Sequence, residues 1–265
     1  MNTWSARLVC KGSPAELVSG WRVIRGYLGK QLGIDPETNF ISQGVGKRRK
    51  LRDPGKALGL DEIENEILLD DSATFRVGVG GPYDRAVARV FGSIPGGIGD
   101  ANYNLSVHLD SSPDWVPLMR MAGSVMELVY GFSYNPGYLV WQSEMDIGRY
   151  ENNFGSAEQR PKIMKGEPPI DRLVIDTSRN PGTLIRENGE FMGVAADMWF
   201  APRFWERRKL NPADVLRAVP GATAEEVHGL TRIRSHEREF DRPDGEQGEI
   251  QKALWKVLFG REVKW

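Results

Sequence analysis

Cysteine and histidine are scarce in this chain of 265 residues, which contains one cysteine and three histidines. The single thiol of Cys10 excludes an intramolecular disulfide and a cysteine-rich zinc site, and it suits a reducing compartment. With three histidines in the chain, a metal site built from histidine alone is also not expected. His228 and His236 are eight residues apart and have no cysteine near them, so they do not indicate a metal-binding pair. The sequence therefore predicts neither a metal site nor a cofactor.

Long apolar runs and an excess of one charge are also absent. No stretch approaches the roughly 20 apolar residues of a transmembrane helix, and residues 1–10 lack the apolar run of a signal peptide. Lysine and arginine together number 35, against 36 aspartate and glutamate residues. This balance provides no general attraction to nucleic acid or to anionic membranes. We expect a cytoplasmic protein that binds neither of them directly.

Apolar residues recur with both strand and helix periods, which predicts an α+β fold with a mixed or mainly antiparallel sheet and several packed helices. Strands are predicted at residues 4–10, 75–80, 103–110, 138–142, 173–175 and 183–185. Helices are predicted at residues 14–33, 82–94, 115–132, 212–219 and 249–259. Thr223 and Glu226 form a capping box that predicts a helix, although residues 227–234 could equally form a strand, and residues 147–169 are expected to form a loop. We expect one domain over residues 1–265, with a possible subdivision near residues 45–71.

The stretch from Gly189 to Trp205 is the most apolar part of the chain, and we predict that it forms the central strand of the sheet. Both of its alternating faces are apolar, which is typical of a strand that is covered on both sides. Asn188-Gly189 is a strong hairpin signal before it, and Pro202 would end its ladder. Asp197 is the exception, because a buried carboxylate must be hydrogen bonded, paired or protonated. Asp197 is therefore either a catalytic acid or metal ligand, or an anchor for a backbone turn or an arginine.

Three motifs come near a known catalytic pattern, and each fails in detail. Residues 78–82, GVGGP, have the position of a phosphate loop, but Tyr83 stands where the dinucleotide fingerprint needs its third glycine. Gly46-Lys47 resembles the end of a P-loop, but Arg48 replaces the hydroxyl residue that would hold magnesium. Residues 131–135 lack the second glycine of a nucleophile elbow. The sequence therefore predicts no catalytic residue and a protein that is not an enzyme.

Two charge runs of opposite sign adjoin in the first third of the chain. Residues 47–52 carry five positive charges but no aromatic side chain on which a base could stack. The acidic run that follows consists of Asp61, Glu62, Glu64, Glu66, Asp70 and Asp71. Like the acidic residues within 237–249, this run either is a solvated surface or faces a basic surface of a protein partner. These six carboxylates are our candidates for a partner-binding site.

Two segments carry a resemblance to a known family: residues 173–176, LVID, and residues 198–205, MWFAPRFW. Together with the order of elements over residues 75–260, they resemble immunity proteins of bacterial polymorphic-toxin and type VI secretion systems, nearest to immunity protein family fifty-two. The resemblance implies a cytoplasmic α+β protein that binds and neutralises a cognate toxin, often a restriction-endonuclease-like nuclease. Because such proteins act by binding, no catalytic residue is carried over to this chain.

Two other functions stay open at the level of sequence. One is an enzyme of unrecognised type that uses Asp197 and residues of the segment 147–169. The other is a nucleic-acid-binding accessory protein that uses residues 47–52. An enzyme is expected to have a concave pocket in which Asp197 meets other titratable groups. A binding protein is expected to have Asp197 buried and satisfied.

Overall fold

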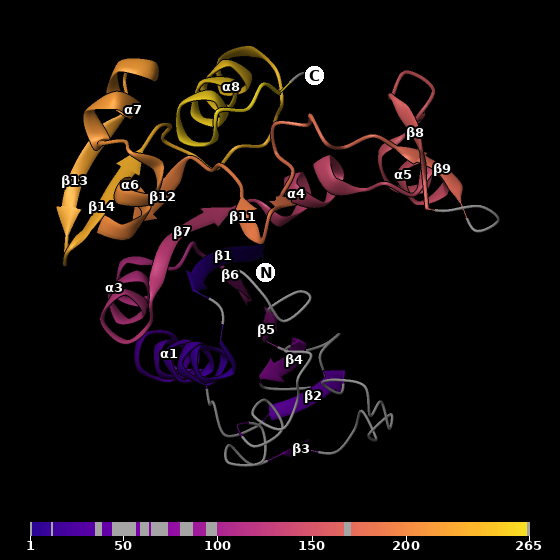
Figure 1. The fold of residues 1–265 in the computed structure, drawn as a ribbon. Coiled ribbons are helices and arrows are strands. Elements are labelled where there is room, and N and C mark those ends of the chain that lie inside the picture. Colours follow the sequence, from indigo (N-terminus) through magenta and orange to yellow (C-terminus); the bar gives the residue numbers. More distant parts are fainter. Residues whose placement is uncertain are drawn as a thin grey trace.

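A ten-stranded antiparallel sheet forms the body of the protein. The computed structural model describes residues 2–11, 13–34, 39–43, 57–58, 64, 74–79, 87–93, 100–166 and 171–263. The strand order is β13-β14-β12-β7-β1-β6-β5-β4-β2-β3, and all neighbours are antiparallel (Figure 1). The strands are β1 (Asn2–Lys11), β2 (Asn39–Gln43), β3 (Ala57–Leu58), β4 (Thr74–Val79), β5 (Ala88–Ser93), β6 (Asp100–Leu109), β7 (Leu128–Tyr134), β12 (Asp197–Phe200), β13 (Thr223–Val227) and β14 (Leu230–Arg234). The predicted α+β class with a mainly antiparallel sheet is confirmed.

Helices cover both faces of this sheet. Helices α1 (Pro14–Leu32) and α3 (Val116–Val125) pack on one face, and α6 (Pro202–Arg208), α7 (Pro212–Ala218) and α8 (Gly245–Phe259) pack on the other (Figure 1). Strand β12 shows why both faces need cover: Trp199 belongs to the α1 side of the core, while its neighbours Met198 and Phe200 belong to the α8 side. All three side chains are fully buried.

The remaining elements are not strands of the large sheet or helices of its two covering layers. They are α4 (Pro136–Ser143), α5 (Ile147–Phe154), the pair β8 (Lys162–Lys165) and β9 (Arg172–Ile175), and the hairpin β10 (Ile185–Glu187) and β11 (Glu190–Met192). The predicted turn between β10 and β11 is confirmed, because Asn188 and Gly189 both have positive φ, at 51° and 81°. Two successive residues of this kind match the twist of the strands they join. In the part of the chain that the structure describes, no helix is long and apolar enough to cross a membrane.

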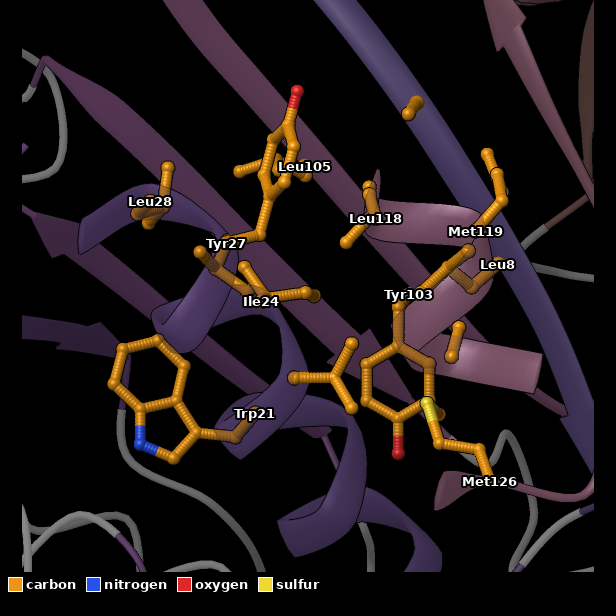
Figure 2. Close-up of a cluster of buried hydrophobic side chains, with 14 of the residues drawn as sticks. Leu8, Trp21, Ile24, Tyr27, Leu28, Tyr103, Leu105, Leu118, Met119 and Met126 are labelled. Atoms are coloured by element: carbon orange, nitrogen blue, oxygen red, sulfur yellow. The ribbon is translucent and has the colours of Figure 1, made fainter. Parts of the chain in front are cut away.

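Helix α1 follows the sequence signals closely. The Ser13 side chain accepts a hydrogen bond from the Glu16 N–H, Pro14 opens the helix, and Gly33 ends it in the left-handed conformation. Its buried side chains pack with α3 against Leu8, Tyr103 and Leu105 of the sheet (Figure 2). A helix with several internal glycines is intrinsically weak, so this packing holds α1 in place.

Gly20 and Gly26 of α1 are expected to respond in opposite ways to replacement by alanine. A Cβ atom on Gly20 would lie 2.3 Å from Cζ of Tyr103, whose ring is fully buried and whose hydroxyl donates a hydrogen bond to the Glu16 carbonyl. We expect Gly20→Ala to lower the free energy of unfolding by about 1–3 kcal/mol, because the helix must move away from the sheet. Among the described residues, Gly26→Ala meets only the flexible end of Met121 at 3.0 Å, so its effect should lie between zero and a gain of about 1 kcal/mol. Urea denaturation of both variants measures the difference, and a Gly20→Ala protein as stable as Gly26→Ala would contradict the close approach.

Several predicted elements are wrong, and burial on both faces explains the error at β7. Residues 88–93 form strand β5 and not part of a helix, and the predicted helix 115–132 ends at Val125, because residues 128–134 form β7. Every residue of β7 is buried, so apolar side chains on both faces also matched a helical spacing. The predicted single strand 189–205 is broken between Met192 and Asp197, and β12 lies two strands from β1 rather than at the middle of the sheet.

Helix starts explain two further corrections. The predicted strand at 138–142 is helix α4, because Asn135 caps it by accepting a hydrogen bond from the Tyr138 N–H and Pro136 opens it. The predicted loop 147–169 contains helix α5, capped by Asp146, and strand β8. Residues 223–227 and 230–234 pair as the hairpin of β13 and β14, so the helix start predicted at Thr223 is wrong and the strand alternative is confirmed at 230–234. Residues 80–86 lie outside the described residues, as does most of the region 45–71, so the single-domain prediction stays a prediction.

Candidate functional site

Asp197 lies at the start of β12, between β7 and β14, and its carboxylate is held by an arginine. Nε and one terminal nitrogen of Arg232 donate to the two Asp197 oxygens at 2.9 and 2.6 Å. Both side chains are about one-fifth exposed, at 18% for Arg232 and 19% for Asp197. Arg232 also lies over the Trp199 ring, 5.0 Å from its centroid. The arginine-anchoring alternative for Asp197 is confirmed.

A cleft of about 480 Å³ opens above this ion pair. Its floor is the sheet face that carries Ser133, Asp197 and Trp199. Further along the same face α1 and α3 cover the sheet. One wall is the segment 112–115 that leads into α3, and the other is the segment 236–241 that follows β14. The cleft therefore forms where the helical layer ends and two connecting segments rise on either side.

Glu239, on the second wall, is the most strongly perturbed carboxyl group of the cleft. Burial raises its pKa from 4.5 to about 7, a hydrogen bond with the Ser133 side chain opposes this, and the nearby Asp197 charge adds to it. A carboxyl group that titrates near neutral pH beside a second carboxylate is a feature of functional sites as well as of structural networks. Sequence reasoning did not single out Glu239, which it included only as one charge within the acidic run 237–249.

The cleft is acidic overall. Its five carboxylates are Asp114, Asp197, Glu237, Glu239 and Asp241. They face three arginines, which are Arg232, Arg234 and Arg238, and the imidazole of His236. Three of its aromatic residues are tryptophans whose indole N–H groups are buried and have no acceptor among the described residues: Trp4, Trp115 and Trp199. No group of three or more histidine, cysteine, aspartate or glutamate residues within the described ranges is arranged to hold a metal ion.

Of the six acidic residues predicted to bind a partner, only Glu64 lies among the described residues. The Arg22 side chain of α1 donates to its two carboxylate oxygens at 2.8 and 2.6 Å. This bidentate contact holds the pKa of Glu64 below its usual value. Asp61, Glu62, Glu66, Asp70 and Asp71 lie outside the described residues, as does the basic run 47–52.

The aromatic residues after β12 belong to the core. Phe204 and Trp205 are 1% and 9% exposed and pack against Phe200. The arginines that follow them make ion pairs: Arg207 with Asp100 at 3.1 Å, and Arg208 with Glu190 at 2.6 Å. These contacts tie α6 to the start of β6 and to β11, so the segment after Pro202 is structural.

Comparisons with known proteins give a likeness of fold. No protein-family model matches the sequence, and no curated protein is significantly similar to it. The resemblance to immunity protein family fifty-two is therefore not confirmed by a family match. Among solved structures, the Pseudomonas aeruginosa T6SS protein PA0821 superposes with a TM-score of 0.52 at 12% sequence identity. The match covers 98% of this chain and 73% of that chain. The two proteins share an α+β fold over nearly the whole length of this one.

Proposed function

We propose that this chain is a type VI secretion-associated immunity protein, which binds and neutralises a cognate antibacterial toxin without catalysis of its own. The observation that carries the proposal is the fold shared with a T6SS protein over 98% of the chain. The sequence resemblance to immunity proteins at residues 173–176 and 198–205 points in the same direction. We further propose that the protein acts in the cytoplasm, where it would meet a toxin that attacks nucleic acid.

Charge supports a nuclease as the toxin. A nuclease that handles DNA presents a basic groove, and complementary acidic surfaces speed association and select partners. This chain has two sources of negative charge, the run of residues 61–71 and the cleft beside Asp197. We propose that Asp61, Glu62, Glu64, Glu66, Asp70 and Asp71 contribute to the contact with the toxin. Because Glu64 already pairs with Arg22, the other five carboxylates have the larger part in this proposal.

Co-expression with the product of the adjacent gene tests the proposed function. We expect growth to be restored and the two proteins to co-purify. Replacing Glu62 and Glu66 by lysine should weaken the complex and reduce its salt sensitivity, because two favourable charges become unfavourable. The matched control is Glu151→Lys with Glu158→Lys, two exposed residues in and after α5. Toxicity that the chain does not relieve would overturn the immunity proposal, and equal affinities for both double variants would remove the acidic run from it.

One observation favours an enzyme as the second candidate function. The cleft brings Asp197 close to Glu239, whose pKa of about 7 suits a general acid or base. The bidentate pairing of Asp197 with Arg232 speaks for the binding protein instead, because it occupies both carboxylate oxygens. The two functions differ in stoichiometry. A binding protein neutralises one toxin molecule per chain, whereas an enzyme that inactivates the toxin works at far lower ratios, so a titration of toxin activity separates them.

A further inference from the structure

The cleft already shows how it binds one guanidinium group. Arg232 lies between the Asp197 carboxylate, which it contacts with two nitrogens, and the face of Trp199. A planar guanidinium suits such a site because it pairs with both carboxylate oxygens and stacks on an aromatic ring. Arg232 therefore offsets the charge of Asp197 inside the cleft, and its other terminal nitrogen contacts Glu225 at 3.1 Å.

Glu239 is the second carboxyl group of the cleft that is largely removed from water, and it has no such cation. Besides burial, its pKa responds to a hydrogen bond with the Ser133 side chain and to the charge of Asp197, and to no basic side chain of the described part of the chain. Arg234 and Arg238 line the cleft but are exposed, and Nδ1 of His236 lies 2.8 Å from the carbonyl oxygen and 3.1 Å from the backbone nitrogen of Arg238. Asp241 pairs with Arg242. Burial of Glu239 without a paired cation therefore favours the protonated form of its carboxyl group in the free protein.

We propose that the cleft receives an arginine side chain from the partner protein, and that its guanidinium pairs with the Glu239 carboxylate as Arg232 pairs with Asp197. This inference rests on the proposed binding function for the identity of the partner, a toxin with a basic surface. Trp4 lines the same cleft and is only partly buried, so its ring offers aromatic surface to a guanidinium group. Cations are attracted to such a surface. Lysine would bind less well, because an ammonium group has no planar fork.

The experiment measures the ionisation of Glu239 by carbon-13 NMR of labelled carboxyl groups, with the Glu239 signal assigned from its absence in Glu239→Gln. In the free protein its titration midpoint should be near the pKa of about 7. A cation that binds only the ionised form must lower this midpoint. We expect saturating N-acetyl-arginine amide to lower it by at least one pH unit, a tenfold change in proton affinity. N-acetyl-citrulline amide, which is nearly isosteric but neutral, should leave it unchanged at equal ionic strength, and N-acetyl-lysine amide should require a higher concentration.

Two variants complete the test. Glu239→Gln should lose arginine-amide binding by at least tenfold, whereas Glu158→Gln, at an exposed position outside the cleft, should retain it. The site is overturned if arginine and citrulline amides shift the midpoint alike, if neither shifts it, or if Glu239→Gln binds as tightly as the unaltered protein. No toxin takes part in this titration. Restored growth in the co-expression assay with a failed titration would reject the arginine site alone, and arginine binding without restored growth would reject immunity alone.

Discussion

Replacing Phe200 with alanine is expected to lower the free energy of unfolding by about 3–5 kcal/mol, the range for deleting a buried aromatic side chain. Phe200 is fully buried at the end of β12. Its ring centroid lies 4.6 Å from that of Phe204, 4.8 Å from that of Trp205 and 6.0 Å from that of Tyr130. These rings come from three different elements, so the cavity left by the substitution cannot close without moving β7, β12 or α6.

Phe154→Ala is the matched control, because it deletes the same side chain at a site that is 37% exposed at the end of α5. We expect this variant to lose about 1 kcal/mol or less. Urea denaturation gives both values from the shift in midpoint at constant slope. Equal losses for the two variants would mean that the aromatic cluster around β12 is not the core of the α8 side of the sheet.

The ends of elements were easier to predict from the sequence than the choice between helix and strand. Ser13, Pro14 and Gly33 bound helix α1 as expected, since each acts through local backbone chemistry that needs no tertiary contact. The same holds for Asn188-Gly189 between β10 and β11. Strand β7 was misassigned because both of its faces are buried, which removes the alternation that identifies a strand.

One of the two carboxyl groups that define the candidate site could be identified from the sequence. Asp197 could be found because a carboxylate in an apolar strand demands a partner, and the structure supplies Arg232. Glu239 could not be found in the same way. It belongs to a segment with no regular periodicity, and only the return of residues 236–241 over the sheet buries it next to Ser133 and Asp197. Burial of this kind depends on tertiary structure, whereas composition shows only one more acidic residue.

Glu239→Gln is expected to stabilise the free protein by about 3 kcal/mol at pH 8 and to leave its stability unchanged at pH 4. Burial raises the pKa of Glu239 from 4.5 to about 7 in the folded state. Below about pH 4.5 the folded and unfolded chains both carry the proton, so the group has no effect on stability. As the pH rises toward 7, only the unfolded chain releases the proton, which favours unfolding. Above about pH 7 the cost reaches its full size, at about 1.4 kcal/mol for each unit of pKa difference.

Urea denaturation between pH 4 and pH 8 tests this sign, with Glu237→Gln as the control. Glu237 is exposed, so its replacement should change stability by no more than about 0.5 kcal/mol at either pH. A Glu239→Gln protein that is less stable than the unaltered protein at pH 8 would show that the carboxylate is already paired in the free state, and it would remove the basis for an arginine site. If the variant is stabilised as expected, Glu239 is a residue that lowers the stability of the free chain. A bound cation would recover that loss by favouring the ionised form. The free energy that destabilises the free protein would then contribute to its affinity for a basic partner.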